Sequence, residues 1–136
     1  LVLAAMYTND ATETVTRLVE VFEPHRHHQM RLRLGRNLKM ILSQRLVAAA
    51  DGSGRIPAFE VLTHTDRTFD YVMDPDRTGR LEEVMAEGAY YGMKTFDQSL
   101  LAMFREGTIT FEEALNNASH PSDFRMAAQK SGLRTA

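Results

Sequence analysis

Three histidines lie close together in the first quarter of the chain and are the first candidates for metal chemistry. His25 and His28 would share one face of a helix, with His27 beside them, and imidazole is a common zinc ligand. No carboxylate stands at ligand spacing from them. A solvated, partly charged helix surface is the simpler interpretation, so we predict no metal site.

Four aspartates form a second group of candidate ligands, Asp66, Asp70, Asp74 and Asp76. Their spacing lacks the central glycine and the terminal glutamate of a calcium-binding loop. Helix capping and solvation are therefore the roles that we expect for them.

The sequence contains no complete catalytic site. A phosphate-binding loop of the Walker type ends in Lys-Ser or Lys-Thr, whereas Gly52-Ser53-Gly54 is followed by Arg55. No hydroxyl nucleophile stands in an elbow motif either.

A run of cations is expected to lie on one long helix, which begins at Glu23-Pro24 and reaches about Val47. Such a surface could bind phosphates or an acidic partner. The helix lacks aromatic residues for base stacking, so we expect no nucleic acid, and a protein interface and plain solvated charge stay open. The cations are Arg26, Arg31, Arg33, Arg36, Lys39 and Arg45, and the first four are the interface candidates.

The composition is that of one globular unit. The 136 residues are 43% hydrophobic and 25% charged, with a formal charge of −2, which gives no global attraction to nucleic acid or an anionic membrane. There are no cysteines, which excludes disulfides. The apolar run Leu1–Met6 is too short to span a membrane and predicts a buried strand, so we expect no membrane insertion. Because the chain opens inside this run, we expect it to be cut from a longer protein.

The sequence pattern predicts a mixed α/β chain in which helices dominate. After the strand Leu1–Met6 we expect a helix of about ten residues from Thr14, the long helix, a turn at Asp51–Gly54 and a strand Arg55–Thr63. Two strands rarely form an independent sheet, so they would belong to a larger parallel sheet, rearrange or pair between chains.

A bundle of short helices should follow, which divides the chain into residues 1–63 and 64–136. Capping signals mark most of these helices, because Thr95 can cap one and Thr110 has capping-box spacing to Glu113. The expected helices are Asp66–Met73, Arg80–Glu87, one from Thr95 to Gly107, one from Thr110, and Pro121–Lys130 with Gly132 as its C-cap.

Several segments, in chain order, resemble motifs of the PilT-like type IV pilus retraction (twitching motility) ATPases, which belong to the type II/IV secretion ATPases. The resemblance covers nearly the whole chain. The segments are Leu1–Asn9 (L-V-x-x-T-L-H-T-N), Arg17–Phe22 (R-I-I-D-V-F), Ile41–Leu46 (V-x-S-Q-x-L), Gly54–Leu62 (G-R-x-x-A-x-E-I-L), Gly92–Leu100 (G-M-Q-T-L-D-x-x-L) and Gly107–Ala114 (G-x-I-x-x-E-E-A).

The resemblance implies a hexameric ring motor that couples ATP hydrolysis to pilus disassembly. Residues 1–63 would be the distal part of its RecA-like core, and residues 64–136 its C-terminal helical region. The phosphate loop and Walker B would precede Leu1, so ATP and Mg²⁺ belong to the full-length protein and none is expected on this fragment, which would be inactive alone. The implied setting is cytoplasmic, at the inner face of the cell membrane, beside the pilus platform protein.

The chain departs from the family pattern at two places. Tyr7 replaces the histidine of the motif that places Tyr7, Thr8 and Asn9 near the nucleotide, and a phenol does not titrate near neutral pH. The retraction signature A-I-R-N-L-I-R-E falls at about Arg67 to Asp74, and only its helical and apolar character survives around Arg67, Phe69, Asp70 and Asp74. A non-catalytic interaction module, docking a partner through the basic helix and the C-terminal bundle, is the alternative function.

For several positions that match the family motifs we expect structural roles. Gly92 would make a turn, Met93 would lie in the core, and Thr95 and Asp97 would cap a helix. Gln44 and Glu60 would be buried and would hydrogen-bond to the backbone.

Overall fold

A computed structural model describes residues 1–131, which form two compact units that alternate along the chain. The first unit comprises Leu1–Ser43 and Glu60–Lys94, and the second comprises Gln44–Phe59 and the chain from Thr95 onward. Helices dominate beside a small two-stranded sheet, so the predicted helix-dominant α/β class is confirmed. The assignment of residues 1–63 and 64–136 to a RecA-like core and a helical region stays a prediction.

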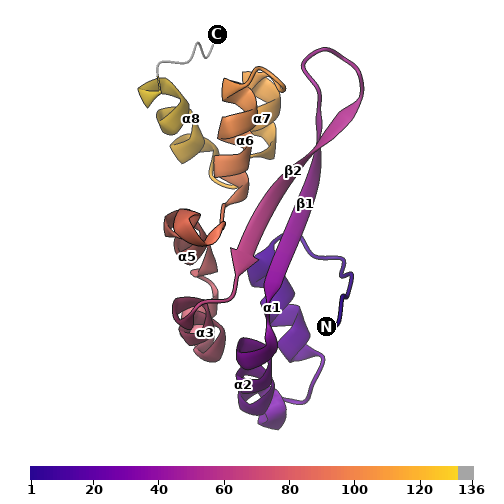
Figure 1. The fold of residues 1–136 in the computed structure, drawn as a ribbon, viewed down its shortest axis with the longest axis vertical. Coiled ribbons are helices and arrows are strands. Elements are labelled where there is room, and N and C mark those ends of the chain that lie inside the picture. The colour runs from indigo at the N-terminus through magenta and orange to yellow at the C-terminus, as the bar shows by residue number, and fades with distance from the viewer. Residues whose placement is uncertain (132–136) are drawn as a thin grey trace. The chain divides into compact units, whose positions relative to one another are not determined.

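The sheet is a hairpin of β1 (Met40–Ala48) and β2 (Arg55–Thr63), which contributes to both units (Figure 1). The predicted turn and the predicted second strand are confirmed. In β1 the buried side chains are those of Ile41, Ser43 and Val47, which lie on one face because side chains alternate along a strand.

The prediction of one helix from Pro24 to about Val47 was wrong. The helix ends at Asn37, and the chain then turns into β1. The apolar spacing of Leu38, Ile41, Leu42 and Leu46 fits a helix, but Ile41 and Val47 also fit the inward face of a strand. Long-range pairing with β2 decided between the two.

The predicted buried strand Leu1–Met6 was also wrong. This segment has no regular secondary structure, and Leu1, Val2 and Leu3 are exposed. A strand needs a partner for its backbone groups, and within residues 1–131 the two strands pair with each other. The expectation of a parallel sheet is therefore replaced by a hairpin.

The first unit contains most of the helices, several of which begin at a capping side chain. Asp10, Thr65 and Asp74 accept hydrogen bonds from the first turns of their helices. The elements are α1 (Ala11–Glu20), the 3-10 turn η1 (Pro24–Arg26), α2 (His27–Asn37), α3 (Asp66–Met73), α4 (Pro75–Thr78), α5 (Leu81–Glu87) and the 3-10 turn η2 (Ala89–Tyr91).

The core of the first unit joins these helices to one end of the hairpin. Ile41 and Leu62 of the strands cluster with Ala11 and Val15 of α1 and with Val72 of α3. Burying a side chain of this size contributes about 1.5–3 kcal/mol. This core fixes the start of α1 against the hairpin.

The second unit consists of α6 (Phe96–Arg105), α7 (Phe111–Asn117) and α8 (Pro121–Lys130) packed on the other end of the hairpin. Thr95 and Gln98 form a complete capping box, and the Thr110 side chain accepts from the Glu113 N–H, as predicted. The predicted C-cap Gly132 lies outside the described residues. Within residues 1–131, no helix combines the length and apolarity needed to cross a bilayer.

Candidate functional site

The predicted nucleotide-proximal residues Tyr7, Thr8 and Asn9 immediately precede α1. The Tyr7 side chain is 100% exposed. Oγ1 of Thr8 lies 2.7 Å from Oγ1 of Thr14, and the Asn9 N–H donates to Oε2 of Glu13 at 2.7 Å. Two of the three candidates are therefore bound to the first turn of α1.

Glu13 is the centre of this N-terminal turn. Its N–H donates to Oδ1 of Asp10, and its carboxylate pairs with Arg17 at 2.7 Å as well as with the Asn9 N–H. The hydrogen bond from Asn9 is the main cause that lowers the pKa of Glu13, with Arg17 adding to it. The interaction is present above the ordinary pKa of glutamate and is lost as the pH falls through the lowered value.

A buried carboxylate ties the start of α1 to the hairpin. Glu60 of β2 is 4% exposed, and its Oε1 accepts from the Ala11 N–H at 2.8 Å and from the Ser43 hydroxyl at 3.2 Å. The prediction that Glu60 is buried and binds the backbone is confirmed. The same prediction for Gln44 was wrong, because Gln44 is exposed on the outer face of β1.

The residues before α1 do not make a nucleotide site by themselves. Tyr7, Thr8 and Asn9 include no cation for phosphates, and the Thr8 hydroxyl is already engaged with Thr14. Across residues 1–131 no cluster of His, Cys, Asp or Glu could hold a metal ion. ATP and Mg²⁺ therefore do not fit these residues alone.

The residues at the position of the retraction signature lie on α3 and at its end. Phe69 is half-buried and faces α2, where a Cβ on Gly35 would come within 2.8 Å of its Cδ2 atom. Asp70 is exposed, whereas the Asp74 side chain caps α4. Phe69 thus packs two helices together, and the absence of a side chain at Gly35 permits this contact.

Replacing Gly35 with alanine should lower the free energy of unfolding by about 1 kcal/mol. Overpacking against the Phe69 ring costs about 1–3 kcal/mol, which outweighs the roughly 1 kcal/mol that alanine gains over glycine inside a helix. Urea unfolding would measure the change. In a Phe69→Ala background the Gly35→Ala substitution should become neutral or stabilising, and equal losses in both backgrounds would contradict the packing explanation.

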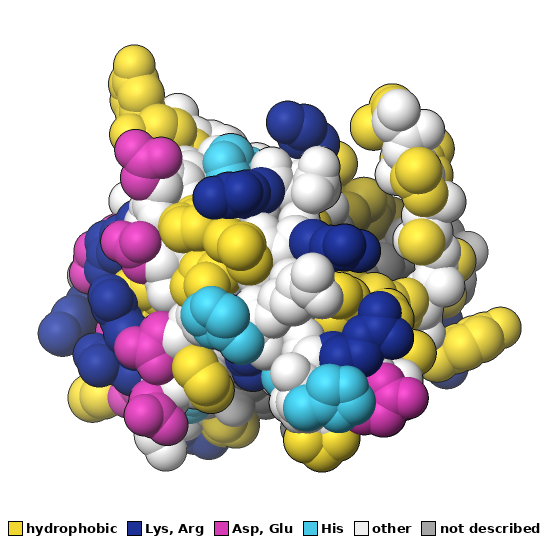
Figure 2. Space-filling view, turned by 90° about the horizontal axis from the view of Figure 1, so that it is seen from below, with side chains coloured by type: hydrophobic (Ala, Val, Ile, Leu, Met, Phe, Trp, Pro, Cys, Tyr) yellow, Lys and Arg dark blue, Asp and Glu magenta, His cyan; other side chains and the backbone are white. Residues whose placement is uncertain are grey.

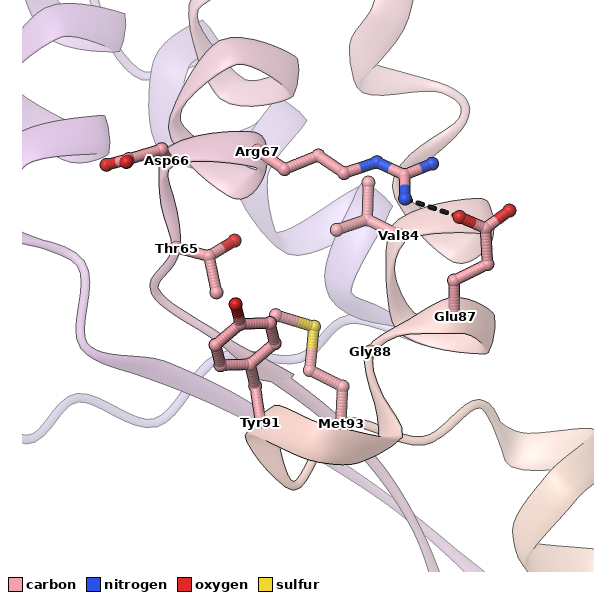
Figure 3. A pocket seen from close by; sticks show the side chains of 8 residues that line it. All are labelled: Thr65, Asp66, Arg67, Val84, Glu87, Gly88, Tyr91 and Met93. Carbon is pink, nitrogen blue, oxygen red and sulfur yellow. Dashed lines mark hydrogen bonds and ion pairs between the residues drawn. The ribbon is translucent and has the colours of Figure 1, made fainter.

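A pocket of about 240 Å³ lies between α3, α5 and η2 (Figure 3). Arg67 of α3 reaches across to Glu87 of α5 and forms an ion pair at one side of the pocket, while Tyr91 and Met93 lie at the other. The Asp66 side chain points away from the pocket. Sequence reasoning named Asp66, Arg67 and Met93 for other roles, but it did not predict the pocket, because the lining residues come from separate elements that only the fold brings together.

Tyr71 of α3 lies between two arginines. The guanidinium carbon of Arg77 is 4.2 Å from the centre of the Tyr71 ring, and that of Arg67 is 5.8 Å away. Arg77 first and then Arg67 lower the pKa of the Tyr71 phenol below its ordinary value. Arg77 therefore links α4 to a buried ring of α3, and Arg67 contacts the same ring from within α3.

Two of the six predicted surface cations are bound inside their units. Nη1 of Arg31 donates to the Val72 carbonyl at 2.8 Å and to Oγ1 of Thr78 at 2.7 Å. Arg45 lies on β1, in the second unit, where it donates to the Asn117 carbonyl at 2.7 Å and stacks over Phe96. The prediction that Arg45 lies on the basic helix was wrong, because that helix ends earlier.

The other interface candidates are at the surface of the first unit. Arg26 lies 3.8 Å from the Glu23 carboxylate, a weak exposed pair. Arg33 and Arg36 are exposed on α2. His25 and His28 are also exposed, whereas Nε2 of His27 lies 2.7 Å from the Phe22 carbonyl oxygen.

The segment from Gly92 to Asp97 has structural roles, largely as predicted. Gly92 has a φ of 75° at the end of η2, where glycine is favoured, and Met93 is buried. Thr95 caps α6. Asp97 differs, because its carboxylate accepts the N–H groups of Ser119 and His120, at 2.6 and 3.0 Å, and thereby holds the connection before α8.

Comparison with known proteins shows that the chain is similar to parts of type IV pilus ATPases. No family model matches the chain. The chain is 36% identical over 126 residues to the type IV pilus ATPase PilU of Pseudomonas aeruginosa, a match that covers 93% of this chain and 33% of PilU. It is 31% identical to a twitching motility protein of Neisseria gonorrhoeae, over 88% of this chain and 32% of that protein.

The solved structure of the pilus retraction motor PilT with bound ADP superimposes with a TM-score of 0.71, at 29% identity, over 89% of this chain and 33% of the PilT chain. The chain is a homologue of part of the PilT-like pilus retraction ATPases. It spans about a third of the length of the curated relatives that it matches. The PilT-like resemblance predicted from the sequence motifs is therefore confirmed.

Proposed function

We propose that this chain is the C-terminal part of a hexameric PilT-like motor that couples ATP hydrolysis to pilus disassembly. In this proposal residues 1–63 are the distal part of the RecA-like core and residues 64–136 are the C-terminal helical region. ATP and Mg²⁺ bind the full-length protein. The motor works in the cytoplasm, peripherally at the inner face of the cell membrane, beside the platform protein of the pilus.

One observation carries the proposal. The similarity to PilU covers 93% of the chain, and the likeness to PilT, the motor solved with ADP, covers 89% of it. These shares are too large to lie within either compact unit alone, so the similarity concerns both units.

The contacts at the start of α1 suggest how this part would respond to nucleotide. The turn at Thr8 and Asn9 is bound to α1, and the Ala11 N–H is bound to Glu60 of the hairpin. A displacement of this turn by a phosphate group would therefore reach β2 through a single buried carboxylate. Tyr7 would meet the nucleotide with a neutral phenol, which can donate a hydrogen bond but supplies no positive charge.

A chimera tests the proposal. The chain alone should hydrolyse no ATP above background, because its 136 residues contain no Walker-type phosphate loop. Joined to the remaining upstream part of Pseudomonas aeruginosa PilU, it should give ATP turnover that is abolished when the phosphate-loop lysine of the added part is changed to alanine. Turnover by the chain alone, or a folded chimera without turnover, would overturn the proposal.

The second candidate function is a non-catalytic interaction module that docks a partner through α2 and the C-terminal helices. The exposed cations Arg33 and Arg36 favour this function. The two candidates differ in the chimera experiment, because a module would support no turnover in any context.

A further inference from the structure

The first unit separates its charges along the chain. Between Glu23 and Asp51 there is no acidic residue, although six Lys and Arg residues occur there. From Asp66 to Glu87 there are seven carboxylates and three arginines. The helix α2 is therefore basic, and the segment from α3 to α5 is acidic.

Three of the cations have no intramolecular anion. Arg31 is bound to α3 and α4, and Arg26 pairs with Glu23. Arg45 belongs to the second unit, where it is bound to the Asn117 carbonyl. The other three cations are exposed on α2 and just after it, and they form no ion pair within residues 1–131. We call Arg33, Arg36 and Lys39 the basic row.

Three exposed aspartates likewise form no ion pair among the described residues. Arg67 pairs with Glu87 and Arg80 pairs with Glu83, and the Asp74 side chain caps α4. Three other aspartates on α3 and α4 are exposed and form no ion pair in the part of the chain that the structure describes. We call Asp66, Asp70 and Asp76 the acidic row.

Each row is electrostatically unfavourable by itself. Arg33 and Arg36 are three residues apart on α2, and Asp66 and Asp70 are four residues apart on α3, so each pair brings like charges together on one helix face. Figure 2 shows this face of the molecule, with most of its acidic side chains on the left, where Lys and Arg side chains lie among them, and further Lys, Arg and His side chains across its middle. The two rows thus carry charges of opposite sign, and the helices α2 and α3 pack against each other.

We propose that the basic row binds the acidic row of a second copy of this chain. Such a contact is head-to-tail, because it joins two different surfaces, and a head-to-tail contact generates a ring when its rotation closes. In a closed ring both rows of every copy are satisfied by its two neighbours, whereas an anionic membrane would satisfy the basic row and be repelled by the acidic row. The inference names a contact surface for the oligomer of the proposed function and rests on that function for the ring.

Sedimentation of the 136-residue chain across a concentration series tests this contact. Self-association should be present at about 20 mM salt and should disappear near 0.5 M salt, where screening is effective within a few ångströms. Association driven instead by the exposed apolar residues Leu1, Val2 and Leu3 would persist or increase with salt. That result, or a wild-type chain that stays monomeric at low salt, would overturn the proposal.

Charge exchange between the two rows gives the decisive control. Arg33→Glu with Arg36→Glu gives a variant with two acidic surfaces, and Asp66→Arg with Asp70→Arg gives one with two basic surfaces. Each variant alone should lose self-association, and an equimolar mixture should regain it. If the mixture stays monomeric, or if either variant associates like the wild type, the contact is wrong.

Two further measurements keep the result interpretable. Circular dichroism checks that the variants are folded. A basic-row variant that does not fold is replaced by Arg33→Gln with Arg36→Gln, and an acidic-row variant by Asp66→Asn with Asp70→Asn. Each of these neutral variants should weaken self-association. Vesicles with anionic lipids test whether the basic row binds a membrane instead of a second copy. Binding to the vesicles without self-association would overturn the proposal. The sedimentation experiment uses no nucleotide, so it is independent of the chimera experiment. A chimera without ATP turnover, together with intact self-association of the chain, would contradict the proposed motor function and still support the proposed contact.

Discussion

Replacing Glu60 with leucine should lower the free energy of unfolding by about 2–4 kcal/mol. The Ala11 N–H and the Ser43 hydroxyl both donate to Oε1 of Glu60 inside the protein, and leucine would leave both donors without this acceptor. Each buried polar group that loses its partner costs about 1–3 kcal/mol. The midpoint of urea unfolding would measure the loss.

A graded series separates this effect from a general sensitivity to mutation. Glu60→Gln keeps an oxygen that can accept from both donors and loses only the charge, so we expect a loss of about 1 kcal/mol. Glu20→Leu changes an exposed glutamate at the end of α1 and should stay within about 0.5 kcal/mol of the wild type. Should the leucine variant fail to fold, faster hydrogen exchange at the Ala11 amide in Glu60→Gln would still report the bond. A Glu60→Leu variant as stable as the Glu20→Leu control would contradict this role.

Local signals in the sequence predicted most of the helices because the signals are physically local. Thr95 and Thr110 each satisfy an N–H group in the first turn of the helix that they precede, so their effect does not depend on the rest of the fold. The same holds for Gly92, whose left-handed backbone ends a turn. Helix boundaries set by such residues can be predicted from a single sequence.

Strand pairing could not be predicted from local signals. The spacing of Leu38, Ile41, Leu42 and Leu46 suits a helix, and β1 exists because β2 lies beside it and completes its hydrogen bonds. The turn at Asp51–Gly54, with strand-forming residues on both sides, was the signal that could have corrected this prediction. For Leu1–Met6 the sequence predicted a strand that does not form. Its apolar residues suit a strand, but no strand of the described residues pairs with it.

The candidate site depended still more on the fold. Arg31 and Arg33 are equivalent in the sequence, yet Arg31 is bound to the Val72 carbonyl and Arg33 is exposed. A count of charges cannot distinguish a structural cation from a free one. The division of the cations into bound and free groups required the contacts of α2 with α3, and the proposed docking surface rests on this division.

Replacing Gly88 with alanine should lower the free energy of unfolding by about 2–4 kcal/mol. A Cβ at Gly88 would lie 2.8 Å from the Val84 carbonyl oxygen and 2.6 Å from Sδ of Met93. Overpacking costs about 1–3 kcal/mol and occasionally more, and here one of the opposing atoms belongs to the backbone of α5 and cannot rotate away. Thermal and urea unfolding would both report the loss.

The sharpest control for Gly88→Ala is the same substitution at Gly79. A Cβ at Gly79 would meet no atom within 4 Å, so alanine there should be neutral or should stabilise by about 0.4–1 kcal/mol through the unfolded state. In a Met93→Ala background, Gly88→Ala should still destabilise, because the clashes with the Val84 carbonyl and with Cβ of residue 93, 2.9 Å away, both remain. If the loss disappeared in that background, the Met93 side chain alone would oppose the new methyl group. The close approach of Gly88 to α5 would then impose no backbone constraint on the pocket between α3 and α5.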